Sequence, residues 1–490
     1  MKPLKKAMSV LVSLLMIFTF ALPTFADSAT YTITAPATEH QYEIYQIFTG
    51  DLSEGILSNV KWGENGTGAK GEAVDAAIIK ALTDVNSKSD REKLNVVEQY
   101  AKLDSAPVAT ISRGATYRAV AGYYLIKDKD NTVSGTDTYT TYIVQVVGDV
   151  TISPKSNVPS FEKKVKDAND TEGVTSDWQD SADYDIGDAV PFKLEGTVSS
   201  KYADYKTYYF AFHDQAETGL TFDKDSVKVY VDGTEITTGY NVETSTTDGD
   251  TFEVVFANLK TIATVHAGSK ITVEYTATLN DKAVLGSQGN VNKAKLEFSN
   301  NPNEQQTGSG KPKTGETPWD NVIVFTYQVV VNKVKADNTP LTGAEFTLEK
   351  VLKDNSKKLV AVVKNTEGTT FTFKGLDDGD YILTETKTPA TYNTIDPIEF
   401  TVTANHEITW STEARTDILT SLSGNATSGT ATFTADLDKG ILTTNVVNQS
   451  GATLPGTGGI GTTIFYVIGG LLMAAAAVLL ITKKRMNSDK

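Results

Sequence analysis

The sequence predicts a mainly β protein of several domains, with some helix near the N-terminus. Threonine, valine and tyrosine, which favour strands, are plentiful, and turns that contain glycine or asparagine recur along the chain. A length of 490 residues, less two terminal targeting segments, leaves room for two to four domains.

The N-terminus has the features of a secretory signal peptide. Lysines within the first six residues precede an apolar stretch from Ala7 to Leu22, and small residues follow up to Ala26. We expect residues 1–26 to be removed, which places the mature protein outside the cell.

The C-terminus combines a pentapeptide, an apolar run and a basic cluster. Leu454-Pro455-Gly456-Thr457-Gly458 is followed by apolar residues from Thr462 to Ile481 and then by Lys483-Lys484-Arg485. The run is long enough to cross a hydrocarbon core of roughly 30 Å as a helix, and the basic cluster stays in the cytoplasm. An ordinary membrane anchor with a chance pentapeptide is the alternative.

Residues 451–490 resemble the cell-wall sorting signal of Gram-positive surface proteins, whose pattern is Leu-Pro-x-Thr-Gly. The resemblance implies that sortase, a membrane transpeptidase, cuts after Thr457. Sortase then holds the Thr457 carbonyl as a thioester, passes it to an amine, and the membrane span is discarded.

Composition limits the partners and the chemistry. The net charge of −16 argues against nucleic acid or an anionic membrane as a partner, and without cysteine there is no disulfide. The four histidines (His40, His213, His266 and His406) have no metal-ligand spacing, and no Gly-x-Ser-x-Gly nucleophile is present. We therefore expect no enzyme, no metal and no cofactor.

The N-terminal region, 27–155, combines expected strands at 30–50, 123–126 and 142–147 with expected helices at 72–85 and 90–103. The strings Tyr-Gln-Ile-Phe-Thr-Gly, ending at Gly50, and Val-Lys-Trp-Gly, ending at Gly63, resemble the first domain of backbone pilins. These are the shaft subunits of sortase-built pili. No trio of lysine, acid and asparagine is evident in this region.

The N-terminal region ends in Ile152-Ser153-Pro154-Lys155-Ser156. Backbone pilins carry a lysine near this point, usually within Tyr-Pro-Lys-Asn, which attacks the thioester of the next subunit. The resemblance implies this role for Lys155, although Ser153 and Ser156 depart from the pattern. A solvated linker lysine remains the alternative.

In the middle region, 156–327, strand alternation directs three polar side chains to apolar faces. Lys163 shares a face with Phe161 and Val165, Asp214 with Phe212, and Asn292 with Ala294, Leu296 and Phe298; Lys293, Lys295 and Glu297 are expected to face water. Because burial of an unpaired charge is costly, Lys163, Asp214 and Asn292 should meet.

This trio resembles the isopeptide-forming site of the fimbrial domain in backbone pilins, as do the segments 218–222, 227–233 and 298–302. The resemblance implies that the Lys163 amine condenses with the Asn292 carboxamide, that ammonia leaves, and that Asp214 shuttles protons. Burial lowers a lysine pKa and raises a carboxyl pKa, so a neutral amine and a neutral acid can coexist. A buried ion pair is the alternative.

The C-terminal region, 328–450, resembles the Cna B-type β-sandwich, which also forms internal isopeptide bonds. The resemblance rests on the segments 329–334, 341–348, 375–376, 379–386 and 445–448. It implies that Lys333 is the amine, Glu385 the proton shuttle and Asn448 the amide, with Asn445 on the opposite face. Thr391 stands where the family usually has glycine, which affects only a turn.

Together these resemblances imply tandem immunoglobulin-like (Cna-type) β-sandwich domains in an elongated row, with boundaries near 155 and 327. The implied function is that of the shaft subunit of a covalent, wall-anchored pilus. Its expected partners are sortase, further copies of the chain, minor pilins, peptidoglycan and host surface ligands. The alternative is a monomeric wall-anchored adhesin with an N-terminal ligand-binding domain on a sandwich stalk.

Overall fold

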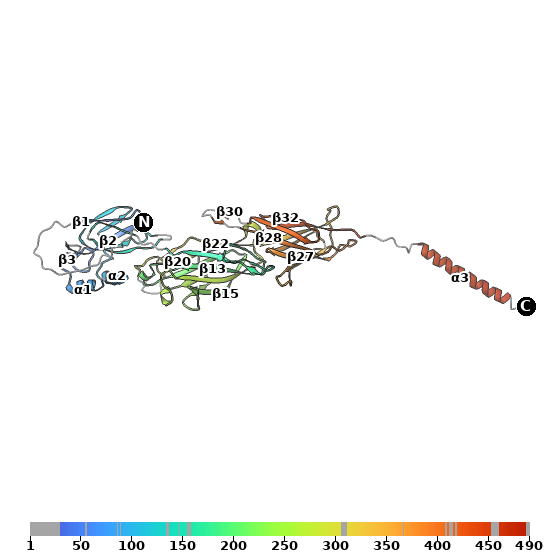
Figure 1. Ribbon diagram of the computed structural model, residues 1–490, viewed down its shortest axis with the longest axis horizontal. Coiled ribbons are helices and arrows are strands. Elements are labelled where there is room, and N and C mark those ends of the chain that lie inside the picture. Colours follow the sequence, from blue (N-terminus) through green and yellow to red (C-terminus); the bar gives the residue numbers. More distant parts are fainter. Residues whose placement is uncertain are drawn as a thin grey trace, which may run out of the picture.

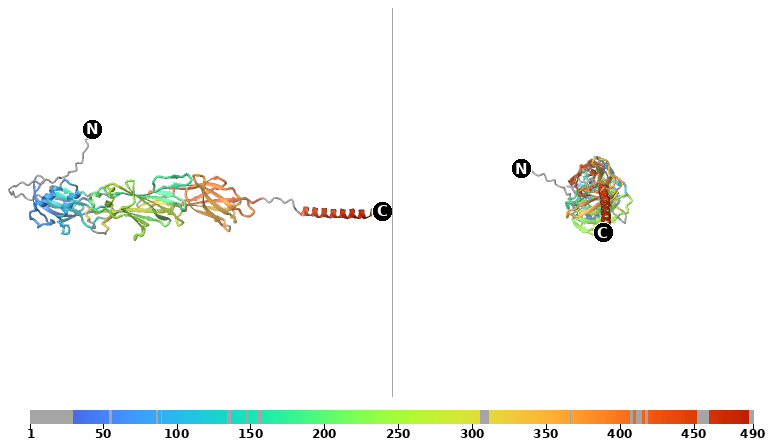
Figure 2. Two further views of the ribbon diagram at one scale, coloured as in Figure 1. Left: turned by 90° about the horizontal axis from the view of Figure 1, so that it is seen from below. Right: turned by 90° about the vertical axis from the view of Figure 1, so that its right-hand side faces the viewer.

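A computed structural model describes residues 30–486, except for 54–55, 86, 89, 134–136, 147, 154–157, 305–310, 366, 407–408, 411–414, 417–418 and 452–459. Three β-rich bodies follow one another in sequence order along one axis, and a helix at the C-terminal end lies beyond them (Figure 1). The end-on view confirms that the bodies form a narrow row (Figure 2). The mainly β fold expected from the sequence is confirmed.

The N-terminal body contains two sheets and two helices. Its elements are β1 Thr30–Thr34, β2 Gln41–Ser53, β3 Ile56–Trp62, α1 Ala76–Asp84, α2 Asp90–Glu98, β4 Ala109–Ser112, β5 Thr116–Val120, β6 Gly122–Asp128, β7 Thr141–Val146 and β8 Val150–Thr151. One sheet has the order β5-β1-β8 and the other β3-β2-β6-β7, with β4 on β2. Both helices are shorter than the sequence predicts.

The middle body is a sandwich of two sheets. Its elements are β9 Phe161–Val165, β10 Ala168–Asn169, β11 Val174–Thr175, β12 Ser181–Asp183, β13 Ala189–Thr197, η1 Tyr202–Asp204, β14 Phe210–Ala216, β15 Leu220–Val231, β16 Thr234–Ile236, β17 Asn241–Glu243, β18 Phe252–Phe256, η2 Leu259–Thr261, β19 Lys270–Leu279, η3 Gly286–Gln288, β20 Asn290–Ser299, β21 Thr314–Glu316 and β22 Asp320–Phe325. One sheet has the order β16-β15-β19-β13-β9; the other has the order β12-β22-β20-β14-β18-β17, with β21 on β20.

The C-terminal body is a second sandwich. Its elements are β23 Tyr327–Lys335, β24 Glu345–Val351, β25 Lys357–Lys364, β26 Thr370–Leu376, β27 Gly379–Lys387, β28 Ile398–Asn405, β29 Thr409–Trp410, β30 Arg415–Thr416, β31 Ser421–Ser428, β32 Phe433–Asp436 and β33 Ile441–Asn448. One sheet has the order β26-β23-β33-β32 and the other β25-β24-β27-β28-β31. The first and last long strands, β23 and β33, are parallel neighbours.

Strand β22 contributes to two hydrophobic cores. Val322 and Val324 pack into the core of the middle body, whereas Ile323 and Phe325 pack into that of the C-terminal body. The β10–β11 hairpin also reaches the C-terminal body, since the Thr171 hydroxyl donates to the Val351 carbonyl at 2.8 Å. The two sandwiches therefore share an extensive junction (Figure 2).

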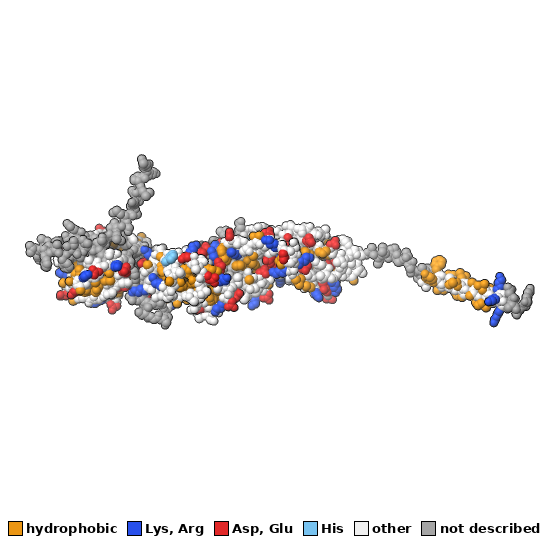
Figure 3. All heavy atoms as spheres, turned by 60° about the horizontal axis from the view of Figure 1, so that its bottom comes forward, with side chains coloured by type: hydrophobic (Ala, Val, Ile, Leu, Met, Phe, Trp, Pro, Cys, Tyr) orange, Lys and Arg blue, Asp and Glu red, His pale blue; other side chains and the backbone are white. Residues whose placement is uncertain are grey.

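The last element, α3 (Ile460–Met486), is apolar on all sides until its basic end. Its segment Thr463–Arg485 has a mean hydropathy of 2.6 and is long enough to span a membrane. The space-filling view shows this apolar helix with Lys483, Lys484 and Arg485 in its last turn, apart from the charged surface of the three bodies (Figure 3).

Candidate functional site

In the middle body, the three polar residues singled out from the sequence meet between the two sheets. Lys163 lies on β9 of one sheet, and Asp214 (β14) and Asn292 (β20) lie on the other; all three are fully buried. The Lys163 amine contacts the Asp214 carboxylate closely. A possible bond between Lys163 and Asn292 would therefore cross from one sheet to the other.

Burial controls the protonation of this site. Loss of hydration lowers the pKa of Lys163 and raises that of Asp214, although each partner opposes the shift of the other. The aromatic rings of Phe192 and Tyr275 flank the amine, each with its centroid 5.3 Å from Nζ. The surroundings therefore favour a neutral amine beside a neutral acid, the pair that proton transfer during amide exchange requires.

Tyr275 on β19 is a fourth member of the site that the sequence analysis did not single out. Its hydroxyl accepts hydrogen bonds from Lys163 Nζ at 2.7 Å and Asn292 Nδ2 at 2.9 Å, and donates one to Asp214 at 2.6 Å. A tyrosine on an apolar face of a strand gives no clear signal, because its ring alone accounts for burial. The Lys163 amine and the Asn292 amide nitrogen therefore both bond to one oxygen atom, that of the Tyr275 hydroxyl.

The C-terminal body holds the second trio. Lys333 (β23), Glu385 (β27) and Asn448 (β33) are all buried, while Asn445 is exposed on the opposite face of β33, as the alternation predicts. Asn448 Nδ2 donates to both Glu385 oxygens at 3.0 and 3.1 Å, and Lys333 Nζ lies 3.9 Å from Glu385. The lysine and the amide come from adjacent parallel strands of one sheet.

The Lys333 amine also has a lowered pKa. Burial lowers this pKa to about 8 against the opposing effect of Glu385, and Nζ donates a hydrogen bond to the Val446 carbonyl at 2.9 Å. The carboxamide oxygen of Asn448 is buried without a hydrogen-bond partner, and so is that of Asn292. Unpaired buried oxygens are costly, and both carbonyl oxygens keep a lone pair that a neighbouring protonated acid could use.

A third buried lysine has a different environment. Lys350 (β24) contacts Asp377 closely and lies 3.2 Å from Asp185 and 3.9 Å from Asp170. Burial alone would lower its pKa, but these carboxylates outweigh that effect and raise it. Lys350 therefore stays a charged ion-pair partner and not a nucleophile.

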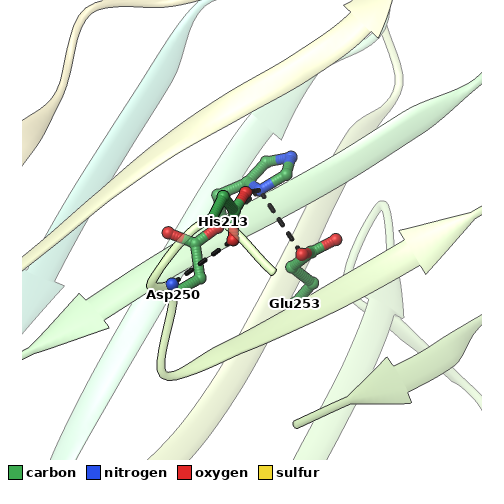
Figure 4. A group of neighbouring side chains, drawn as sticks. His213, Asp250 and Glu253 are labelled. Carbon is green, nitrogen blue, oxygen red and sulfur yellow. Dashed lines mark hydrogen bonds and ion pairs between the residues drawn. The ribbon is translucent and has the colours of Figure 1, made fainter. Parts of the chain in front are cut away.

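A histidine cluster lies on the outer face of β14. His213 Nδ1 bonds to Asp250 at 2.7 Å and lies 3.9 Å from Glu253 (Figure 4). Its Nε2 bonds to Glu297 at 3.1 Å. The expectation that Glu297 faces water is wrong, because only 4% of it is exposed. Strand β21 pairs with β20 at this point, and Thr314 and Lys311 are further partners of Glu297.

Three predicted positions lie outside the described residues: the signal peptide, Lys155 and Thr457 with its pentapeptide. Lys155 belongs to the segment between β8 and β9, and Thr457 to the segment between β33 and α3. Their proposed roles rest on the sequence.

Three family models match the chain. They are a Gram-positive pilin backbone subunit 2, Cna-B-like domain over 186–302, a prealbumin-like fold domain over 327–416, and an LPXTG cell wall anchor motif over 446–488. The trypsin-resistant surface T6 protein of Streptococcus pyogenes serotype M6 is 26% identical over 403 residues, which cover 68% of this chain and 70% of that protein.

One solved pilin structure shares the fold, and a second is given for comparison. The T6 backbone pilin of serotype M6 Streptococcus pyogenes has a TM-score of 0.55 at 20% identity and covers 88% of this chain and 100% of its own. The full-length major pilin SpaD from Corynebacterium diphtheriae has a TM-score of 0.48 at 17% identity, with 89% and 100% covered.

The fold and the three matched segments define a wall-anchored surface protein of Gram-positive bacteria. More specifically, the chain is a backbone pilin of sortase-assembled pili, secreted and held at the cell surface by its LPXTG anchor, whose membrane segment is α3.

Proposed function

We propose that this backbone pilin forms the shaft through two kinds of isopeptide bond, one between subunits and two within each subunit. The regions 27–155, 156–327 and 328–450 are the three domains of the shaft. Minor pilins and adhesion to host ligands complete the proposed role. The observation that carries the proposal is that a buried lysine, acid and amide meet in each sandwich.

The internal reaction exchanges one amide for another. The neutral lysine amine attacks the asparagine carboxamide carbon, the acid protonates the carboxamide and takes up the amine proton, and the proton then moves to the leaving nitrogen. One C–N bond forms, one breaks, and ammonia leaves. Lys163–Asn292 with Asp214 and Lys333–Asn448 with Glu385 are the two reactive sets, and fixed proximity supplies the rate.

Accurate mass measurement of the purified chain tests the internal bonds. The wild type should be lighter than its sequence mass by two ammonia molecules, and Asp214→Ala and Glu385→Ala should each restore one. Asp320→Asn is a matched control, because Asp320 accepts from the Lys163 backbone nitrogen at 2.7 Å, whereas the Lys163 amine bonds to Asp214 and Tyr275. A full sequence mass for the wild type would leave two buried ion pairs in place of the bonds.

Between subunits, Thr457 is the acyl donor and Lys155 the nucleophile. Lys155→Arg keeps the charge but removes an amine that can deprotonate, so high-molecular-weight ladders should disappear while the monomer is still anchored. Lys166→Arg is the control, since Lys166 is the nearby alternative and lies over the Trp178 ring, 4.8 Å from its centroid. Ladders that survive the first variant and are lost in the second would move the linkage to Lys166. Ladders that survive both would place the linkage on another lysine, whereas a wild type without ladders would favour the monomeric adhesin.

A further inference from the structure

Acidic side chains from both sandwiches gather at the junction between them. One group (Asp170, Asp185, Asp188 and Asp377) is paired with Lys350 and Lys358. The other group consists of Asp167, Asp183 and Asp378. Within the described part of the chain, no lysine or arginine nitrogen is recorded within 4.0 Å of this second group; His406 is its basic neighbour.

The second group has a geometry suited to ligation. A carboxylate oxygen from each of Asp167 and Asp183 and a ring nitrogen of His406 all lie within 4.8 Å of one another. Asp167 follows β9, Asp183 ends β12, and His406 follows β28. Two of these ligands therefore come from the middle body and one from the C-terminal body.

One carboxylate oxygen of the group has no hydrogen-bond partner. Asp183 is 2% exposed, and its Oδ2 atom is buried without a hydrogen bond. His406 Nδ1 bonds to the Ser181 hydroxyl at 2.6 Å, which directs Nε2 towards Asp183, yet Nε2 stops 3.9 Å from Oδ1. A hydrogen bond that fixes one ring nitrogen while the other faces carboxylates is the usual arrangement around a metal-ligating histidine.

We propose that Asp167, Asp183 and His406 bind a divalent transition-metal cation, such as Zn²⁺ or Mn²⁺, that ties the middle sandwich to the C-terminal sandwich. One imidazole nitrogen with two carboxylate oxygens suits these ions better than Ca²⁺ or Mg²⁺, which prefer oxygen alone. Water completes the coordination.

The charge balance of the junction supports the proposal. The carboxyl groups of Asp167, Asp183 and Asp378 lie near one another with His406 beside them, so like charges face one another at the junction. A bound cation removes this repulsion at neutral pH. Asn169 of the middle body donates through Nδ2 to Asp378 of the C-terminal body at 2.8 Å. This hydrogen bond holds the Asp378 carboxylate at the junction, next to the site.

The His213 cluster supplies a contrast. It too brings a histidine together with Asp248, Asp250 and Glu253, but both nitrogens of His213 already have carboxylate partners. That ring would have to give up a hydrogen bond to bind a metal. His213→Gln is therefore the matched control.

Calorimetric titration tests the site on the full-length chain, purified in detergent and stripped with EDTA. ZnCl₂ or MnCl₂ should bind with one ion per chain and raise the melting temperature, while CaCl₂ should bind more weakly. His406→Gln and Asp183→Asn should each weaken binding by at least ~10-fold. Loss of a residue that only orients a metal ligand already weakens binding by about that factor. His213→Gln should bind as the wild type does.

Two results would overturn the proposal. One is a stripped wild type that neither binds Zn²⁺ or Mn²⁺ nor melts later in their presence. The other is binding that survives in His406→Gln and is lost in His213→Gln. Should Asp183→Asn fail to fold, His406→Gln decides alone, because His406 lies at the edge of the junction with its side chain 10% exposed.

Discussion

The side chains around each buried lysine determine whether the pKa of its amine is lowered or raised. Lys163 and Lys333 each face one acid and one amide, and burial lowers their pKa, whereas the carboxylates around Lys350 raise its pKa. Burial alone therefore does not make a lysine a nucleophile. The number of carboxylates around the amine decides whether its pKa falls or rises. Three lysines of equal burial therefore differ in the surroundings of their amines, and only Lys163 and Lys333 have the surroundings that the proposed bonds require.

Tyr275→Phe should slow formation of the Lys163–Asn292 bond without disturbing the core. The phenyl ring keeps its packing against Phe192 and Phe252, but the hydroxyl that binds the amine, the acid and the amide is lost. Loss of ammonia after refolding, followed by mass, should be delayed for one of the two bonds. Tyr381→Phe, beside Lys350, should leave both rates unchanged. Equal rates in Tyr275→Phe would exclude a role for the hydroxyl.

The His213 cluster predicts a pH dependence of the middle domain. Burial would lower the pKa of His213, but hydrogen bonds to Glu297 and Asp250 raise it. Because the folded pKa exceeds the unfolded one, this stabilisation is complete below about pH 6.5 and is lost as pH rises through the folded value. The facing groups are Asp248, Asp250, Glu253 and Glu297, the last also paired with Lys311.

The pKa of Glu297 is shifted in the opposite direction from that of His213. Burial would raise its pKa, but bonds from His213, Lys311 and Thr314 lower it to about 2, so its contribution is lost only as pH falls towards that value. Between about pH 6 and 9 only the His213 contribution should be lost, so the melting temperature of the middle domain should fall. Each kcal/mol of lost stability lowers that temperature by about 2–4 °C. His213→Gln should flatten this slope. An unchanged slope would place the titrating group elsewhere.

At this scale the sequence predicted the inward residues well. Lys163, Asp214, Asn292, Lys333, Glu385 and Asn448 are all buried, because alternation in a two-sheet sandwich leaves little choice of face. The burial of Glu297 was missed because its partners His213, Lys311 and Thr314 come from other segments, which alternation along β20 does not reveal. His406 and its acids were missed because they come from three separate segments, so no spacing could reveal them.

Among the elements, the paired strands determine what each bond would hold together. Lys333 and Asn448 lie on β23 and β33, adjacent and parallel, so their bond joins the first and last strands of one sheet. Lys163 and Asn292 lie on β9 and β20, in opposite sheets. One bond therefore holds strands within a sheet, and the other holds two sheets together.

Glu385→Ala should lower the melting temperature of the C-terminal domain strongly. Joining residues 333 and 448 closes a loop of more than a hundred residues, which stabilises by roughly 4–5 kcal/mol through the unfolded state. For a domain of this size that corresponds to roughly 10–30 °C. Calorimetry should show the shift in one transition only, with Asn445→Ala as the exposed control. A shift of only a few degrees would mean that the lost carboxylate, and not a bond, is responsible.

Helix limits show why element boundaries were harder to predict. The apolar spacing suggested 72–85, but α1 begins at Ala76 because Ala73 pairs with Lys61 and Asp75 caps the helix through the Ala77 nitrogen. Likewise α2 ends at Glu98 since Ala101 bridges to Gly66. Contacts with residues elsewhere in the N-terminal body therefore fix the start of α1 and the end of α2, against the local apolar periodicity.

In the whole molecule, the row of bodies has joints of different kinds. Only Thr326 separates β22 from β23, and β22 lies in both cores, so the two sandwiches are held as one stiff unit. The four apolar residues 322–325 are consistent with a strand buried on both faces, but the sequence could not tell that two different domains cover it. The cation site proposed above lies at this same junction.

The joint between the sandwiches and the two proposed bonds would together determine how the shaft carries load. A pull enters the middle domain through β9 and leaves the C-terminal domain through β33. If Lys163 is bonded to Asn292 and Lys333 to Asn448, the covalent path bypasses residues 164–291 and 334–447. Only the stretch from 293 to 332, which contains β21 and β22, carries force through non-covalent contacts.

Single-molecule pulling should therefore show little extension of the wild type at forces that unfold unbonded sandwiches. Asp214→Ala should add one event that releases residues 164–291, and Glu385→Ala one that releases 334–447. At about 3.3–3.6 Å for each extended residue, each event lengthens the chain by roughly 400 Å, less the folded span. The double variant should show both events, and Asp320→Asn neither. Events of that length in the wild type would mean that force reaches the sandwiches through hydrogen bonds alone.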